Sequence, residues 1–151
     1  MNRHTQSATV RVVIAGQAEF ATCLEIRTRV FVEEQGVPPE LEEDRHDPAA
    51  THWLALSADG PVGTARARRL GDAVKAERVA VEAGYRRRGV GRALMEAIEG
   101  WARQQGLTCL MLNAQLTALP FYLGLGYQAE GAIFEEAGIP HRALSKSLKA
   151  N

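Results

Sequence analysis

A strand-loop-helix segment between Lys75 and Gly106 constrains the fold of this chain more than any other stretch. The apolar, strand-like run from Ala76 to Val81 leads through a short turn into Arg86-Arg87-Arg88-Gly89-Val90-Gly91-Arg92. Apolar residues then recur at helical spacing, at Val90, Leu94, Ile98 and Trp101. The segment is therefore expected to pass from a buried strand through a loop into the N-terminus of an amphipathic helix.

The loop at the start of this helix is suited to bind an anion. Gly89 and Gly91 lack a Cβ atom, so a bulky charged group can approach the backbone closely. The first amides of a helix have no partner within the helix, and the macrodipole adds partial positive charge there. We predict that amides from Arg87 to Ala93 bind a phosphate or pyrophosphate, with the side chains of Arg86 and Arg88 as supplementary charge.

The spacing of the glycines excludes two familiar phosphate sites. A nucleotide P-loop would need Gly-x4-Gly-Lys-Ser/Thr, and the sequence has no such run. A dinucleotide fingerprint would need a third glycine, but Gly89-Val90-Gly91 is followed by Arg92-Ala93-Leu94. The ligand of this loop is therefore expected to be neither ATP nor NAD.

Length and composition fit one compact domain over residues 1–151. The chain is 46% hydrophobic, which supplies a sizeable core, and two domains would both be too small. It has no run of the roughly 20 apolar residues that a membrane span needs and no signal-peptide pattern, so we expect a cytoplasmic protein. Cys23 and Cys109 lie in apolar segments without metal-ligand spacing, and we interpret them as reduced core residues rather than a disulfide.

The charges are segregated along the chain although the net charge is zero. Residues 33–47 are strongly acidic, and residues 66–92 are rich in arginine. This pattern fits two ligand parts of opposite charge, but it also fits two solvated surfaces. Zero net charge and the lack of interleaved aromatic residues argue against a nucleic-acid binder.

The remaining hydrophobic patterns predict strands and helices in alternation. We expect strands near 10–14, 51–57, 62–69, 74–81, 109–112, 128–135 and 142–148, and helices near 17–34, 90–105 and 115–125. Pro120 is expected to interrupt the last helix, and alternating Thr64, Arg66 and Arg68 predict a wet face on the third strand. The order predicts an α/β (α+β) fold, with a mixed sheet and helices on its faces.

Two motifs resemble those of the GNAT N-acetyltransferases. Arg86-x-x-Gly89-x-Gly91, after a strand that ends Arg78-Val79-Ala80-Val81, is similar to the segment that binds the acyl-CoA pyrophosphate in that superfamily. Ala118-x-x-Phe121-Tyr122-x-x-x-Gly126-Tyr127 resembles its second motif, in which the tyrosine protonates the departing CoA thiolate. The resemblance implies a mostly antiparallel sheet of about six to seven strands flanked by helices on both faces.

A narrower resemblance, to the ElaA/YjcF-like branch of GNAT proteins, covers most of the chain. It rests on Arg29 to Gln35, on Glu43-Asp44 with Asp47 and His52, on Asn113-Ala114-Gln115, and on Glu135 to His141. Many GNAT proteins have asparagine where this chain has Gln115, and Ala-Gln is the usual form in this branch. The branch is poorly defined in substrate, so it bears on fold and cosubstrate more than on the acceptor.

The resemblance implies an acetyl-CoA-dependent N-acetyltransferase without a metal, in which an amine attacks the thioester directly and Tyr122 is the general acid. The central strand is expected to splay from its neighbour, so that backbone groups near Val79 to Val81 bind the pantetheine and the acetyl carbonyl. The full set of expected acyl-CoA-binding residues is Val79, Ala80, Val81, Arg86, Arg87, Arg88, Gly89, Val90, Gly91, Arg92, Ala93, Gln115, Phe121 and Tyr122.

A general base is expected as well, because an alkylamine with a pKa near 10.4 must lose its proton before it attacks. The candidates are Glu33, Glu77, His52 and His141, and the branch resemblance favours Glu33 and His141 as residues that line the acceptor site. The acidic segment 40–47 either attracts a cationic amine or is a solvated loop.

The expected acceptor is a small-molecule or protein amine, and the resemblance suggests a homodimer. Neither a nucleic acid nor a membrane is expected as a partner. A different class of function stays open, in which the chain is a non-catalytic acyl-CoA-binding sensor or partner module, although Tyr122 favours catalysis.

Overall fold

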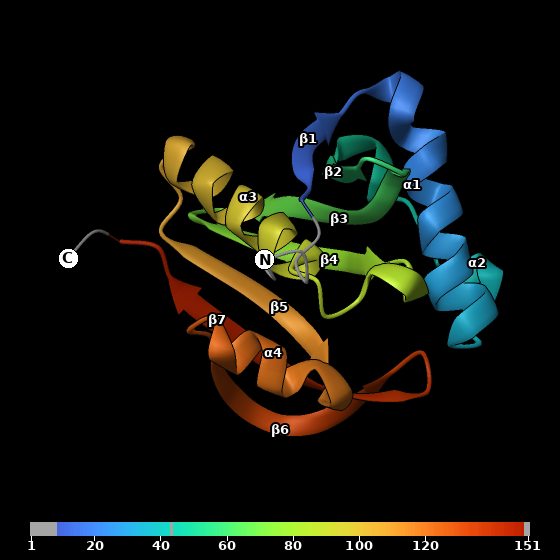
Figure 1. Cartoon of the computed structure of the whole chain (residues 1–151). Coiled ribbons are helices and arrows are strands. Elements are labelled where there is room, and N and C mark those ends of the chain that lie inside the picture. Colours follow the sequence, from blue (N-terminus) through green and yellow to red (C-terminus); the bar gives the residue numbers. More distant parts are fainter. Residues whose placement is uncertain (1–8, 43, 150–151) are drawn as a thin grey trace, which may run out of the picture.

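The computed structural model describes residues 9–42 and 44–149. These residues form one seven-stranded sheet with the order β1-β2-β3-β4-β5-β7-β6 (Figure 1). Neighbouring strands are antiparallel except β4 and β5, which are parallel. The mixed, mostly antiparallel sheet predicted from the sequence is thus confirmed.

The strands lie close to the predicted segments. They are β1 (Arg11–Ala15), β2 (Thr51–Ser57), β3 (Gly60–Leu70), β4 (Ala73–Val81), β5 (Cys109–Gln115), β6 (Gln128–Glu136) and β7 (Ile139–Ser147). β5 begins with the unbroken apolar run Cys109 to Leu112 from which it was predicted. β2 and β3 form the expected hairpin, with Ser57 opposite Gly60.

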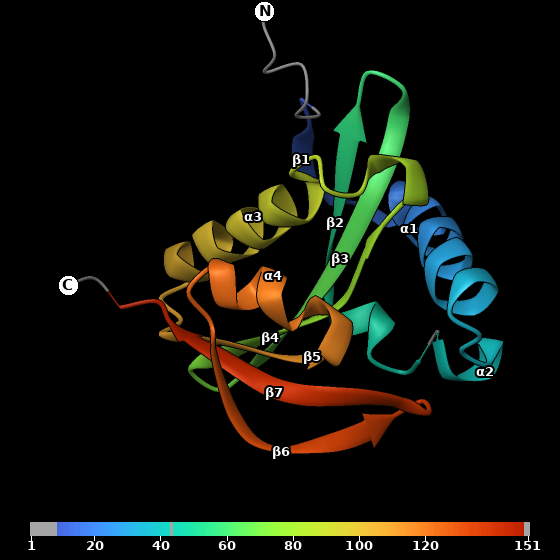
Figure 2. The same ribbon diagram turned by 60° about the horizontal axis from the view of Figure 1, so that its bottom comes forward.

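Helices cover both faces of the sheet, with α1 and α2 on one side and α3 and α4 on the other (Figure 2). The α-helices are α1 (Phe20–Arg27), α2 (Pro39–Glu42), α3 (Val90–Gln104) and α4 (Leu119–Gly124). The shorter helical segments are η2 (Gln17–Glu19), η3 (Thr28–Glu34), η4 (Asp47–Ala49), η5 (Ala83–Tyr85) and η6 (Leu116–Ala118). No helix in the described part of the chain is long and apolar enough to cross a membrane.

The helix predicted over 17–34 is present, but its geometry changes along its length. A 3₁₀ turn, η2, leads into α1, and η3 continues α1 as a π-helix. The wider turns of a π-helix rotate the side chains after Arg27 away from their positions in a regular α-helix. The directions of the side chains of residues 28–34 therefore cannot be predicted from the 3.6-residue period of an α-helix.

Two predictions about local structure are wrong. Pro120 does not interrupt a helix, because it lies in the first turn of α4, where the missing amide costs nothing. The predicted face of β3 is not solvent-exposed at Arg66, whose side chain is only 1% exposed. Its charge is matched by the carboxylates of Asp44, Asp47 and Glu77, which the alternating pattern does not indicate.

The apolar stripe of α3 anchors the main core. Val90, Leu94 and Ile98 are buried, and they pack with β-sheet residues such as Trp53. Trp101 packs edge-to-face on Trp53, with ring centroids 5.4 Å apart. A second core under α1 contains the buried Cys23; Cys109 is half-buried, and both are free thiols, as predicted.

β4 and β5 separate halfway along the sheet. They pair only over residues 73–76 of β4, and a bulge at Arg78, whose φ is 56°, interrupts the pairing of β4 with β3. Ala80 and Val81 still face Thr64 and Gly63 on β3 but have no strand partner on the β5 side. This is the splay that the resemblance implies.

Candidate active site

A cavity of about 910 Å³ lies where β4 and β5 separate. It extends from the loop before α3, past the free edge of β4, to charged residues on β3 and β4. The predicted site residues that line it are Val79, Ala80, Val81, Arg86, Arg87, Gly89, Gly91, Arg92, Gln115, Phe121, Tyr122 and His141. Segments far apart in sequence thus meet around one space, as the motifs require.

The loop from Arg86 to Arg92 has the geometry expected of an anion site. Gly89 is left-handed, with φ 86°, and directly precedes α3. Ala93 donates its amide to the carbonyl oxygen of Gly89 at 3.0 Å, so its amide is occupied, and the free amides of this helix start lie before it. Gly91 packs on Phe121, since a Cβ added to Gly91 would lie 3.2 Å from Phe121 Cζ.

Three residues predicted to bind the cosubstrate do not line the cavity. Val90 is buried in the main core, and the Ala93 amide serves the helix. Arg88 lies over the ring of Tyr85, with its guanidinium carbon 5.3 Å from the ring centroid. The cavity lining formed by the segment from Arg86 to Ala93 is therefore discontinuous, and cosubstrate binding by these three residues stays a prediction.

Arg86 lines the cavity and connects η3 with the end of β4. It donates two hydrogen bonds of 2.6 Å to the carboxylate of Glu34, at the end of η3, and one of 2.9 Å to the Val81 carbonyl oxygen. A second bridge joins the same regions, because Gln115 donates to the side-chain oxygen of Gln35 at 2.7 Å. η3 is thus tied both to the loop and to the end of β5.

Tyr122 lies on α4 with its side chain directed into the wall of the cavity. It is 7% exposed and packs edge-to-face against Phe121 and Tyr127. Burial raises the pKa of Tyr122 well above its ordinary value. The phenol is therefore protonated throughout the physiological pH range.

His141, on β7, has a defined tautomer. Its Nδ1 atom lies 2.6 Å from the carbonyl oxygen of Ile139. A carbonyl only accepts, so Nδ1 donates this hydrogen bond, and in the neutral ring Nε2 is the atom that has the lone pair. The ring stacks on Phe134 at 6.0 Å, which fixes its plane.

The other three base candidates lie in different surroundings. Glu33 lines a separate pocket with Ala21 and Thr28, so the structure does not bring it to Tyr122. His52 is outside the cavity, where Nε2 contacts the Asp47 carbonyl oxygen at 2.9 Å and burial lowers its pKa. Glu77 lines the cavity, but hydrogen bonds from Arg68 and Arg66 outweigh its burial and lower its pKa to about 2.

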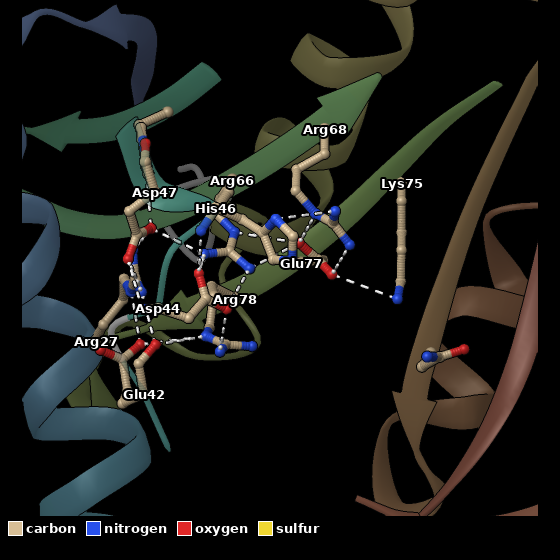
Figure 3. Close-up of polar contacts among 12 residues, drawn as sticks. Arg27, Glu42, Asp44, His46, Asp47, Arg66, Arg68, Lys75, Glu77 and Arg78 are labelled. Carbon is tan, nitrogen blue, oxygen red and sulfur yellow. Dashed lines mark hydrogen bonds and ion pairs between the residues drawn. The ribbon is translucent and has the colours of Figure 1, made fainter. Parts of the chain in front are cut away.

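The acidic segment is neutralised by arginines (Figure 3). Arg27 contacts Glu42 at 2.6 Å and Asp47 at 2.8 Å. Arg66 contacts Asp44 at 2.7 Å and Asp47 at 2.9 Å, and its hydrogen bonds hold the pKa of Asp44 far below its usual range. Among the described residues of segment 40–47, the carboxylates of Glu42, Asp44 and Asp47 are thus paired with arginines from outside the segment, whereas Glu40 is exposed.

Comparison with known proteins gives the family. Residues 12–148 match the family described as acetyltransferase (GNAT) domain. The chain belongs to the GNAT acetyltransferases. Two Bacillus subtilis proteins are similar over most of their lengths: YyaT is 37% identical over 91% of this chain and 95% of its own, and the uncharacterized N-acetyltransferase YjcF is 35% identical over 89% and 97%.

The structural comparison supports the same branch of the GNAT family. Escherichia coli ElaA superposes with a TM-score of 0.78 at 25% identity, over 92% of this chain and 99% of that one. Together with YjcF it confirms the ElaA/YjcF-like resemblance. GNAT proteins use acyl-CoA, and no group of histidine, cysteine or acidic side chains among residues 9–42 and 44–149 could hold a metal ion.

Sequence reasoning missed several residues of this GNAT site. Gln35 and Glu34 lie within the quoted branch motif, but nothing in their spacing indicates that they reach Gln115 and Arg86. Lys75, Asn113 and Glu136 also line the cavity. Their position at the open end of the β4–β5 separation depends on strand register, which no local pattern specifies.

Proposed function

We propose that this GNAT protein is an acetyl-CoA-dependent N-acetyltransferase that transfers the acetyl group to a primary amine by direct attack in a ternary complex. The observation that carries the proposal is the convergence of the glycine loop, the free edge of β4 and Tyr122 on one cavity. Each of these would contact a different part of acetyl-CoA, in the order in which they follow one another along the cavity.

The glycine loop would hold the pyrophosphate. The backbone amides that precede Ala93 lie at the N-terminus of α3. Gly89 and Gly91 would allow the pyrophosphate to approach the backbone closely. An aminoglycoside 6′-N-acetyltransferase whose structure contains coenzyme A shares this fold, with a TM-score of 0.74 at 15% identity over 93% of this chain and 98% of that one. It supports the fold as one that accommodates CoA.

The free edge of β4 would hold the thioester. Backbone groups of Val79 to Val81 have no strand partner on the β5 side. The Val81 carbonyl oxygen accepts from Arg86 Nε, and the remaining polar groups on that side need a partner. A backbone amide directed at the acetyl carbonyl would stabilise the oxyanion that forms when the amine attacks. This is the charge that develops only in the transition state.

His141 and Tyr122 would move the two protons. Deprotonation of an alkylamine at neutral pH costs about 4 to 5 kcal/mol, and the Nε2 lone pair of His141 can accept that proton. Tyr122, kept protonated by burial, would donate to the sulfur as the C–S bond breaks. Because its raised pKa also makes it a weak acid, this donation would be concerted with bond cleavage.

A thiol-release assay with acetyl-CoA and a set of amines tests the proposal. Wild-type protein should release CoA only when an amine is present. Tyr122→Phe should lower kcat about 100-fold or more while the acetyl-CoA Kd changes little, because the ring remains and only the proton donor is lost. Equal turnover would remove Tyr122 as the acid, and acetyl-CoA binding without amine-dependent release would instead support a non-catalytic sensor.

A further inference from the structure

Among the described residues, the end of the cavity farthest from the glycine loop has an excess of positive charge. Glu77 there contacts three cations: Arg66 at 2.8 Å, Arg68 at 2.8 Å and Lys75 at 3.4 Å. Arg66 is also shared with the acidic segment, where Arg27, Arg66 and Arg78 match Glu42, Asp44 and Asp47 one for one. Glu77 is therefore the only described carboxylate left for both Arg68 and Lys75.

Lys75 is the cation that this arrangement leaves available. Arg68 makes hydrogen bonds of 2.8 and 3.1 Å to Glu77, whereas Lys75 donates no hydrogen bond to a described residue and has only its 3.4 Å ion pair. Its side chain is 24% exposed and lines the cavity. Figure 3 shows Lys75 at the end of the chain of contacts, beyond Glu77 and apart from the acidic segment.

A single negative charge lies nearer the reacting end. Glu136 lines the same cavity, and its carboxylate contacts the amide of Asn113 at 3.4 Å without an ion pair to any described residue. Asn113 lies two positions along β5 from Met111, which is opposite Lys75, so the backbones of Asn113 and Lys75 are offset by about 7 Å along the strand. The open half of the cavity thus contains both a cation, Lys75, and a carboxylate, Glu136, which is held by a residue farther along the strands.

The register of β4 fixes which end faces the thioester. Val79 follows Lys75 by four positions, which corresponds to about 13 Å of extended strand, less the shortening at the Arg78 bulge. An acceptor amine beside Val79 would therefore extend its far end toward Lys75. The glycine loop lies beyond Val81, so Lys75 is not placed to serve the phosphates of CoA.

We propose that the acceptor is an amino carboxylate, whose amine lies toward Glu136 and His141 and whose carboxylate is bound by Lys75 beside Arg68. This inference rests on the proposed function and adds the class of acceptor. It differs from the expectation of a simple cationic amine attracted by the acidic segment, because arginines already pair with Glu42, Asp44 and Asp47. Ammonium-carboxylate contacts of this kind change affinity about tenfold or more.

Matched pairs of amines test the inference. A series of ω-amino carboxylates of increasing length is compared with n-alkylamines of the same lengths, using CoA release by wild type, Lys75→Met, Lys75→Arg and the exposed control Lys149→Met. We expect wild type to prefer the amino carboxylate at least about tenfold in kcat/KM at the best length. Lys75→Met should lose most of that preference through KM, Lys75→Arg should keep part of it, and Lys149→Met should keep all of it.

Binding to the protein–CoA complex, measured by calorimetry with the same amines, separates the two proposals. Amino-carboxylate binding that weakens about tenfold in Lys75→Met supports the inference even if no amine is turned over, whereas turnover failure alone would contradict the proposed function. Equal kcat/KM for both amine classes, or a preference unchanged by Lys75→Met, overturns the amino-carboxylate assignment and leaves the acetyltransferase intact.

Discussion

Replacement of Arg66 by glutamine should destabilise this protein more than loss of any exposed arginine. The Arg66 side chain is 1% exposed, and its guanidinium makes five hydrogen bonds of 2.7 to 3.1 Å to Asp44, Asp47 and Glu77. Glutamine cannot supply the charge or reach all three carboxylates. Arg66→Gln therefore leaves buried negative charge that the fold stabilises in the wild type.

The size of the loss in stability depends on which cationic partners each carboxylate keeps in Arg66→Gln. Removal of one partner from a buried ion pair costs about 3 to 5 kcal/mol. Asp47 keeps Arg27, Asp44 keeps Arg78 and Glu77 keeps Arg68, so none is left without a cation. We expect the lower end of the range, about 3 kcal/mol, which for a domain of this size lowers Tm by about 6 to 12 °C.

Urea unfolding followed by circular dichroism measures this loss. Arg92→Gln is the matched control, because its 3.1 Å pair with Glu96 is 63% and 61% exposed and should contribute about 0.5 kcal/mol or less. Arg66→Lys keeps the charge but not the planar fork, so its stability should fall between wild type and Arg66→Gln. If Arg66→Gln and Arg92→Gln cost the same, the buried network does not stabilise the fold as described.

Three further predictions concern the site and its pH dependence. Gly91→Leu should weaken acetyl-CoA binding at least about tenfold in calorimetry, since a Cβ there already lies 3.2 Å from Phe121, whereas Gly100→Leu, with open space, should not. His141→Gln should lower kcat at neutral pH, and the deficit should shrink as the pH approaches the pKa of the amine; a parallel pH–rate profile would exclude His141 as the base. The folded-state pKa of Glu77 is about 2, below its ordinary 4.5, so its contribution to stability is full above the ordinary pKa and is lost as the pH falls toward 2. The free energy of unfolding of Glu77→Gln should accordingly depend less on pH between about 4.5 and 2 than that of the wild type. An unchanged pH dependence would contradict the pairing of Glu77 with Arg66 and Arg68.

The segment from Lys75 to Gly106 was predictable because its signals are local. Apolar spacing marks α3, and Gly106, with φ 76°, ends it where the sequence suggests. The glycines of the loop and the motif around Tyr122 are contiguous patterns as well. Their meeting around one cavity follows once the strand order is known.

The ion-pair network was not predictable, because its members are distant in sequence. Arg66 pairs with residues 11, 19 and 22 positions away, and Arg86 reaches Glu34 across 52. An arginine alternating with small residues is typical of a solvated strand face, and burial of Arg66 depends on carboxylates delivered by another segment. The direction of the Glu33 side chain could not be predicted for a different reason. Glu33 lies in the π-helical turns of η3, where the α-helical period does not apply.

The central claim, acetyl transfer from acetyl-CoA to an amine, is tested most directly by following the acetyl group itself. Protein is incubated with ¹³C-acetyl-CoA and the ω-amino carboxylate series, and the amines are analysed by mass spectrometry. We predict labelled N-acetyl product that requires both protein and amine and falls with Tyr122→Phe. Label that stays in bound acetyl-CoA, or appears only as acetate, would contradict acetyl transfer to an amine.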